Sequence, residues 1–180
     1  MKYSLQLFLL TTLLLTIGSC ENRRGERGSN RSERNEFSQK SAIRDGYFLV
    51  KKVVDGDTFN VDDGSKKGLK VRLIGIDTPE TRRTGRKEIG YFGKEAKEYM
   101  ISLIANKRVK LEYDVRKLDR YQRTLAYVYL EDGTFVNAEL IKNGFAMVLT
   151  IPPNVKFADE FARLQQEARE NNRGLWKPQN

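Results

Sequence analysis

The sequence contains no histidine and only one cysteine among its 180 residues, and these absences exclude several kinds of chemistry. Without histidine there is no Ser-His-Asp or Cys-His triad and no imidazole metal ligand. A single cysteine forms neither an internal disulfide nor a cysteine-rich zinc site. A metal ion bound by this chain therefore needs oxygen ligands, which favour calcium, magnesium or manganese.

Positive charge, by contrast, is abundant. Lysine and arginine number 33 against 24 aspartate and glutamate residues, which gives a formal net charge of +9 at pH 7. This balance makes a polyanion such as nucleic acid the first partner to consider, with an acidic membrane surface second. The length suits a single domain, for which a monomer is the expected state.

The first twenty residues have the character of a targeting segment. The apolar run from Leu5 to Ile17 is too short to span a bilayer and fits the apolar region of a signal peptide. It ends in the sequence IGSC at Cys20, which resembles the bacterial lipoprotein box, where cleavage leaves the cysteine carrying lipid. We expect a signal peptide over 1–19, a lipid anchor at Cys20 and a place in the bacterial cell envelope or at its surface. An ordinary secretory signal, and hence a secreted protein, is the alternative.

The segment that follows has a different composition. Residues 21–44 carry seven basic and four acidic side chains and few apolar ones. Such a segment buries too little apolar surface to offset the entropy lost on ordering. We therefore expect a lipidated cysteine and a disordered basic tether over 20–44, followed by a folded domain over 45–180.

The hydrophobic pattern from Asp45 onward predicts five strands and three helices. Apolar runs bounded by turn residues predict strands, and apolar residues three or four positions apart predict amphipathic helices. The expected strands are Tyr47–Val54, Thr58–Asp62, Leu69–Ile76, Arg108–Tyr113 and Thr124–Leu130. The expected helices are Phe92–Ile104, Val136–Ile141 and Phe157–Ala168. Five strands with a helix after the third suit a small Greek-key barrel with appended helices, although strand count alone does not exclude other small mixed domains.

A first candidate motif, Asp55-Gly56-Asp57-Thr58, lies between two expected strands. Asp-Gly pairs mark tight turns, so a purely structural turn is one interpretation. In the functional interpretation, the two carboxylates at the mouth of the strands bind a hard cation.

A second motif, RLIGIDTPE, runs from Arg72 to Glu80. On a continuous strand, Arg72 would share a largely apolar face with Ile74 and Ile76. A guanidinium there needs an anionic partner, which is either a nearby carboxylate or a phosphate whose oxygens match the planar fork. Asp77 and Glu80 add a candidate metal ligand and a candidate base.

A third motif, DRYQRTL from Asp119, is by itself an ordinary basic loop, but it supplies a second arginine, Arg123. Phosphodiester hydrolysis needs cations that neutralise the phosphate, an oriented water and a stabilised leaving group. The residues that together contain these groups are Asp57, Asp77, Glu80, Arg72 and Arg123. The sequence does not show that they meet in space.

These segments resemble the staphylococcal (thermonuclease) nuclease family from Tyr47 to Trp176. The matching segments are VVDGDTF, VRLIGIDTPE, YFGKEAKEYM, LDRYQRTLAYVYLEDGTFVNAELIKNGFA and ARENNRGLW, in family order and spacing. The resemblance implies an α+β fold, a β-barrel with helices: a five-stranded Greek-key OB-fold barrel plus three α-helices. It also implies an exported calcium-dependent phosphodiesterase that acts on DNA and RNA and leaves 3′-phosphate ends.

The resemblance further implies a ligand set for one Ca²⁺ ion. Asp57, Asp77 and the backbone carbonyl of Thr78 would bind it, with Asp55 in support.

Catalytic roles follow from the same resemblance. Glu80 would orient or deprotonate the attacking water. Arg72 and Arg123 would hold the scissile phosphate, and Arg123 would assist departure of the 5′ oxygen. Tyr121 and Arg120 would contact the substrate.

The chain departs from the family pattern in one segment. Where the secreted enzyme of the family has tyrosines that line the nucleotide site, this chain reads LTIPP over Leu149–Pro153. Two alternatives to an enzyme remain open: a non-catalytic, lipid-anchored OB-fold module that binds nucleic acid, and a structural envelope lipoprotein.

Overall fold

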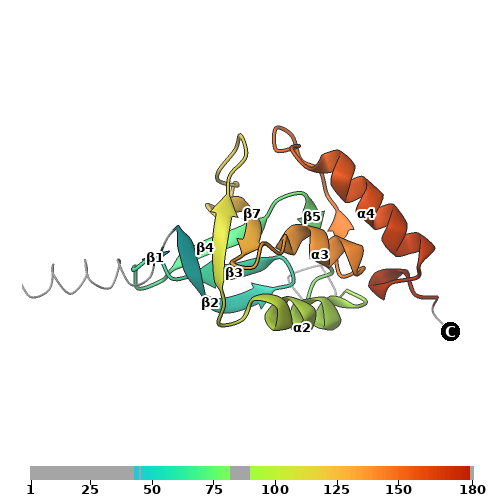
Figure 1. Ribbon diagram of the computed structural model, residues 1–180, viewed down its shortest axis with the longest axis horizontal. Coiled ribbons are helices and arrows are strands. Elements are labelled where there is room, and N and C mark those ends of the chain that lie inside the picture. Colours follow the sequence, from blue (N-terminus) through green and yellow to red (C-terminus); the bar gives the residue numbers. More distant parts are fainter. Residues whose placement is uncertain (1–42, 45, 82–89, 179–180) are drawn as a thin grey trace, which may run out of the picture.

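The computed structural model describes residues 43–44, 46–81 and 90–178 (Figure 1). The predicted signal peptide, the lipidation site at Cys20 and nearly all of the predicted tether lie outside the described residues. Strand β1 (Ile43–Arg44) pairs antiparallel with β2, so the sheet begins two residues before the expected start of the domain at Asp45. No helix in the described part of the chain is long and apolar enough to cross a bilayer.

Five strands form a closed barrel, as predicted. They are β2 (Tyr47–Asp55), β3 (Thr58–Val61), β4 (Leu69–Leu73), β7 (Thr124–Leu130) and β6 (Arg108–Glu112). The strands are hydrogen-bonded in that order, and β2 pairs with β6 as well, which closes the sheet on itself. β4 and β7 run parallel and the other pairs antiparallel, so the barrel is mixed.

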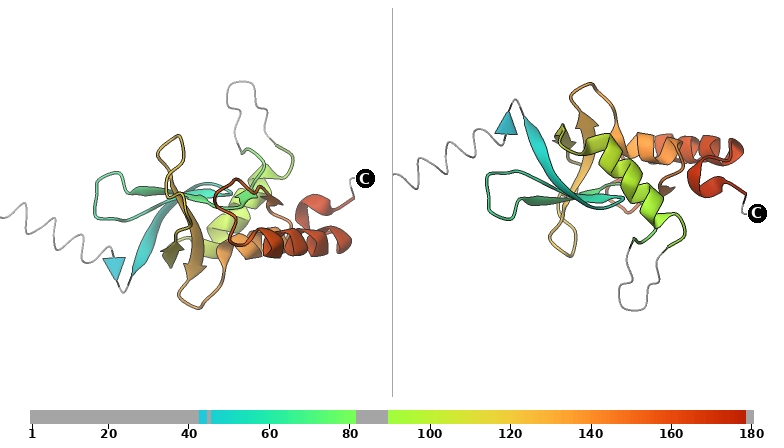
Figure 2. Two further views of the ribbon diagram at one scale, coloured as in Figure 1. Left: turned by 90° about the horizontal axis from the view of Figure 1, so that it is seen from above. Right: turned by 90° about the horizontal axis from the view of Figure 1, so that it is seen from below.

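Three α-helices in the described part of the chain accompany the barrel, as predicted. They are α2 (Gly93–Ile104), α3 (Val136–Lys142) and α4 (Ala158–Glu170), and a short 3₁₀ helix, η1 (Gly174–Trp176), follows. α2 crosses in front of the barrel strands in the right-hand view of Figure 2 and buries Met100 and Ile104 completely. α3 packs against β7 and α4, so α4 is attached to the barrel mainly through α3.

The predicted third strand is wrong in its extent. β4 ends at Leu73, and Gly75 then adopts a left-handed φ of 78° that ends the ladder. The ring of Phe161 packs so closely on Gly75 that a Cβ there would lie 2.7 Å from it. The chain resumes as β5 (Ile76–Asp77), which pairs with β8 (Met147–Val148) in a separate small sheet.

This break changes the environment of Arg72. Within β4, Val71 and Leu73 are buried in the barrel core, so Arg72 points away from the core on the opposite face. The continuous strand on which Arg72 was expected to share an apolar face with Ile74 and Ile76 is therefore wrong, although the three residues line one cavity.

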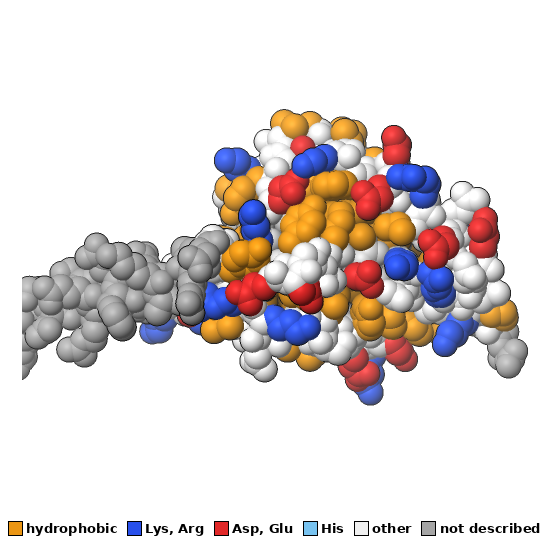
Figure 3. All heavy atoms as spheres, viewed as in Figure 1, with side chains coloured by type: hydrophobic (Ala, Val, Ile, Leu, Met, Phe, Trp, Pro, Cys, Tyr) orange, Lys and Arg blue, Asp and Glu red, His pale blue; other side chains and the backbone are white. Residues whose placement is uncertain are grey.

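Charged side chains of both signs are interspersed over the face of the molecule seen in Figure 3. The positive net charge of the chain is therefore not concentrated on that face.

Candidate active site

The turn between β2 and β3 brings Asp57 against Arg72 of β4. Thr58 and Arg72 are direct partners across the two strands, and the backbone N–H of Leu73 donates to the carbonyl of Asp57 at 3.0 Å. Nη1 of Arg72 lies 2.6 Å from Oδ2 of Asp57, and Nη2 donates to Oδ1 of Asp77 at 2.8 Å. One guanidinium therefore joins two carboxylates, one from the β2–β3 turn and one from β5.

The pair of Arg72 and Asp57 is buried, whereas Asp77 opens to solvent. The exposed fractions of the side chains are 12% for Arg72, 8% for Asp57 and 46% for Asp77. Removing one partner of a buried ion pair leaves an uncompensated charge, at a cost of about 3–5 kcal/mol. Arg72 therefore organises the site even before a substrate binds.

The contact between Arg72 and Asp57 is an ion pair without hydrogen-bond geometry. Nη1 is buried and finds no hydrogen-bond acceptor among the described residues, although Oδ2 of Asp57 is only 2.6 Å away. The distance shows strong Coulomb attraction, but the hydrogen-bonding capacity of this nitrogen is unused.

Thr78 completes the surroundings of Asp57. Oδ1 of Asp57 accepts from the hydroxyl of Thr58 at 2.9 Å, and Oδ2 accepts from the N–H and hydroxyl of Thr78 at 3.1 and 3.2 Å. Position 56 next to this contact requires a glycine, because a Cβ on Gly56 would lie 2.8 Å from Oγ1 of Thr78. The structure thus assigns a role in positioning Asp57 to the N–H and hydroxyl of Thr78, while its carbonyl remains a predicted ligand.

The donor set includes two carboxylates that suit a hard cation. No three acidic or cysteine side chains gather into a metal site in the described ranges, but Asp57 and Asp77 are held together by Arg72. Two carboxylates, with backbone carbonyls and water for the remaining ligands, are a donor set that calcium accepts. The residues present therefore fit calcium.

Asp55 and Glu80 are placed by their local backbone. Oδ1 of Asp55 accepts from the N–H of Gly56 at 2.9 Å, within the turn itself. The carbonyl of Glu80 accepts from the N–H of Gly90 at 2.9 Å, and a Cβ at Gly93 would lie 2.5 Å from the same carbonyl. The beginning of α2 thus fixes the Glu80 backbone three residues beyond Asp77, and the part taken by its carboxylate stays a prediction.

Arg123 is held by Asp119 in the loop before β7. Nε of Arg123 donates to Oδ2 of Asp119 at 2.6 Å. Oδ1 accepts from the N–H groups of Tyr121 and Arg123 at 2.8 and 2.9 Å. Burial of Asp119 opposes ionisation, but these hydrogen bonds and the charge of Arg123 outweigh it and lower the pKa of this carboxyl.

Asp119 was not among the predicted site residues. An aspartate that begins a turn and accepts from backbone N–H groups further along is a recognisable local pattern, so DRYQR contains a usable signal. What the pattern lacks is any indication that the same carboxylate also holds Arg123.

Tyr121 projects from this loop with two guanidinium groups near its ring. The residue is 64% exposed, and the guanidinium of Arg120 lies 4.7 Å and that of Arg123 5.5 Å from the ring centre. Cation–π contacts of this kind keep the ring at the rim of the site.

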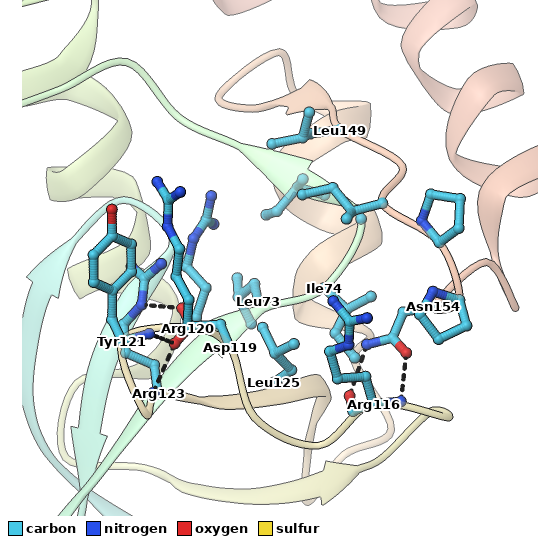
Figure 4. A pocket seen from close by; sticks show the side chains of 16 residues that line it. Leu73, Ile74, Arg116, Asp119, Arg120, Tyr121, Arg123, Leu125, Leu149 and Asn154 are labelled. Carbon is cyan, nitrogen blue, oxygen red and sulfur yellow. Dashed lines mark hydrogen bonds and ion pairs between the residues drawn. The ribbon is translucent and has the colours of Figure 1, made fainter.

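Arg72 and Arg123 line the same cavity, which has a volume of about 500 Å³ (Figure 4). Arg72 faces Leu125 across the parallel β4–β7 pair, and Arg123 precedes Leu125 by two residues, which explains why the two arginines meet. The charged residues that line the cavity are Arg72, Arg116, Arg120, Arg123 and Asp119. The cavity is therefore suited to an anion.

The Leu149–Pro153 segment forms one wall of this cavity. Leu149, Ile151, Pro152 and Pro153 all line it, and the N–H of Leu149 donates to the carbonyl of Gly75 at 2.9 Å. The departure from the family pattern noted in the sequence thus lies in the site, where aliphatic side chains stand in place of aromatic rings.

The structure brings most of the predicted site together. Arg72 contacts Asp57 and Asp77, and Thr78 contacts Asp57. Arg72 shares the cavity with Arg120, Tyr121 and Arg123, whereas the predicted carboxylates are not among the residues that line it. Asn154 and Arg116, which also line the cavity, were not predicted.

Comparison with known proteins identifies the family. Residues 70–178 match the model of a family described as staphylococcal nuclease homologue. The chain is 41% identical over 136 residues to a thermonuclease of Staphylococcus intermedius, covering 75% of this chain and 79% of that protein. It is 39% identical over 130 residues to a thermonuclease of Staphylococcus hyicus, covering 72% and 75%. An uncharacterized endonuclease of Escherichia coli O157:H7 is 36% identical over 140 residues, covering 78% and 83%. The chain belongs to the staphylococcal nuclease family.

Proposed function

We propose that the chain is a calcium-dependent nuclease that hydrolyses phosphodiester bonds of DNA and RNA and leaves 3′-phosphate ends. The observation that carries the proposal is that Arg72, which is paired with Asp57 and Asp77, lines the same cavity as Arg123. The thermonuclease and endonuclease relatives support hydrolysis of nucleic acid.

The two arginines bind the scissile phosphate in this proposal. Negative charge grows on the phosphoryl oxygens as water attacks, and guanidinium groups stabilise it best when they are fixed beforehand. The carboxylates Asp57 and Asp77 fix Arg72, and Asp119 holds Nε of Arg123. The terminal nitrogens of Arg123 are then directed to the substrate, where one of them donates to the departing 5′ oxygen.

The attacking water is assigned to Glu80. Glu80 orients this water and accepts its proton as the water attacks. A calcium ion held by Asp57, Asp77 and the carbonyl of Thr78 would supply further positive charge beside the phosphate. Asp55 supports this group from the neighbouring turn.

The identity of the product ends tests the proposal. The purified full chain is incubated with calcium and a defined DNA or RNA oligonucleotide, and the fragments are analysed by mass spectrometry. We expect fragments ending in 3′-phosphate from both substrates. Fragments ending in 5′-phosphate would contradict the assigned roles, and binding without cleavage would make the chain a nucleic-acid-binding module.

We further propose that the protein is exported and anchored by lipid on Cys20, with residues 1–19 removed and residues 20–44 as a tether. The proposal rests on the apolar run and the IGSC sequence. Cys20→Ser is expected to move the protein from the membrane fraction to the soluble fraction. Unchanged membrane association of this variant would contradict the anchor.

A further inference from the structure

We infer that Arg116 is a second phosphate-binding residue of the cavity and that it binds the substrate strand beside the site of cleavage. The inference extends the proposed function, because it concerns how the same cavity holds a longer substrate. It begins from a contact between segments far apart in the chain.

The backbone of Arg116 is clamped by a buried side chain. Its N–H donates to Oδ1 of Asn154 at 2.8 Å, and its carbonyl accepts from Nδ2 of Asn154, also at 2.8 Å. Asn154 is only 5% exposed, and both ends of its amide bind the backbone of Arg116. The position from which the Arg116 side chain starts is therefore fixed, although Arg116 itself lies at the surface.

Arg116 lies at the opposite end of the cavity from the loop of Arg123, as Figure 4 shows. The N–H of Asp119 donates to the carbonyl of Arg123 at 3.1 Å, so these two residues are neighbours. Arg116 precedes Asp119 by three residues, a span of at most roughly 10 Å. A strand whose scissile phosphate contacts Arg123 thus has a neighbouring phosphate within reach of Arg116.

The charge of Arg116 is available to a ligand. None of the described carboxylates forms an ion pair with it, whereas Arg72 and Arg123 are both paired with aspartates. A guanidinium of this kind matches the oxygens of a phosphate. The aliphatic side chain of Ile151 and the ring of Pro152 also line the cavity and offer apolar surface to the nucleoside that connects the two phosphates.

Substrate length provides the test. Binding to the full chain is measured in chelator, so that no cleavage occurs, with a dinucleoside monophosphate by NMR titration and an octanucleotide by fluorescence anisotropy. Arg116→Ala is expected to weaken octanucleotide binding about tenfold and to leave the dinucleoside monophosphate, which has no second phosphate, unchanged. It is also expected to reduce the salt slope for the octanucleotide by about 0.7, the value for one phosphate contact on a single strand.

Lys117→Ala is the matched control. It removes the same charge from the next residue, whose ammonium lies 5.5 Å from the ring centre of Tyr113 and which does not line the cavity. Equal effects of the two variants, or an equal loss for both ligands in Arg116→Ala, would overturn the inference. Because binding is measured without turnover, a chain that shows the expected Arg116 effect but never cleaves would refute the proposed nuclease activity alone.

Discussion

Arg72 holds Asp57 at 2.6 Å through one terminal nitrogen and Asp77 at 2.8 Å through the other. The two aspartates come from the β2–β3 turn and from β5, and the hydrogen bonds from Thr78 to Asp57 also join these segments. The two terminal nitrogens of one planar guanidinium thus contact both carboxylates. The geometry of the site therefore depends on Arg72 together with the hydrogen bonds of Thr78 to Asp57.

Replacing Arg72 by lysine is the first test of that dependence. A single ammonium group cannot hold both carboxylates and a phosphate, so Arg72→Lys is expected to lower kcat/KM by about 10²–10³-fold. Lys70→Ala is the control, because Lys70 is exposed on the same strand and does not line the cavity. Unfolding by denaturant shows whether the Arg72 variant is folded. Near-normal cleavage by a folded Arg72→Lys protein would remove the phosphate clamp from the mechanism.

The role assigned to Glu80 predicts a loss of turnover with little loss of binding. Glu80→Gln keeps the size of the side chain but cannot accept a proton, so kcat is expected to fall about 10²–10⁴-fold. Oligonucleotide affinity is expected to stay within a few-fold of the parent, as measured in chelator. Glu98→Gln, an exposed change on α2, is expected to alter neither quantity. Equal turnover in the two variants would show that Glu80 does not act on the water.

Replacing Gly56 by alanine tests whether the contact between Asp57 and Thr78 matters for activity. The added Cβ of Gly56→Ala would lie 2.8 Å from the hydroxyl of Thr78 and must displace it. We expect a loss of about 1–3 kcal/mol in the free energy of unfolding, together with a clear loss of cleavage. Gly133→Ala strains a left-handed residue in open space, so it is expected to cost similar stability but no activity. Unchanged cleavage in both variants would show that the contact between Asp57 and Thr78 does not matter for activity.

The lowered pKa of Asp119 predicts that the free energy of unfolding depends on pH. Its pKa in the folded protein is lowered from 3.8, because burial is outweighed by hydrogen bonds and by the charge of Arg123. A lowered pKa stabilises the fold at pH values above that of the unfolded carboxyl, and the stabilisation is lost as the pH falls through the folded pKa.

Comparison with Asp119→Asn measures this contribution. The difference in free energy of unfolding between the parent and the variant is expected to be constant between about pH 5 and 7 and to shrink as the pH falls below about 4. Denaturant unfolding at a series of pH values gives the difference directly. A difference independent of pH down to acid conditions would show that the ionised carboxylate does not stabilise the loop.

The sequence predicted the barrel and the three helices because these depend on local patterns, whereas the contact of Asp57 with Arg72 was not predicted. Short apolar strands are bounded by turn residues, and the two acidic motifs stand where strands end. The break at Gly75 was not predictable, because VRLIGI reads as one apolar run. Only the packing of Phe161 on Gly75 shows that the strand ends there.

The contact of Asn154 with Arg116 at the far end of the cavity could not be predicted from the sequence for a similar reason. Asn154 holds Arg116 across 38 residues, and neither residue belongs to a motif. A buried amide that satisfies a distant backbone leaves no periodic signal, so its partner is known only once the chain is folded.

The measurement that tests the central claim most directly is cleavage of single-stranded and duplex DNA by the purified full chain in calcium, in magnesium and in chelator, with Glu80→Gln alongside. We predict cleavage in calcium, its loss in chelator, and its near-complete loss in Glu80→Gln. Cleavage that persists in chelator, or that Glu80→Gln retains, would contradict the account. So would the absence of cleavage under every condition while nucleic acid is still bound.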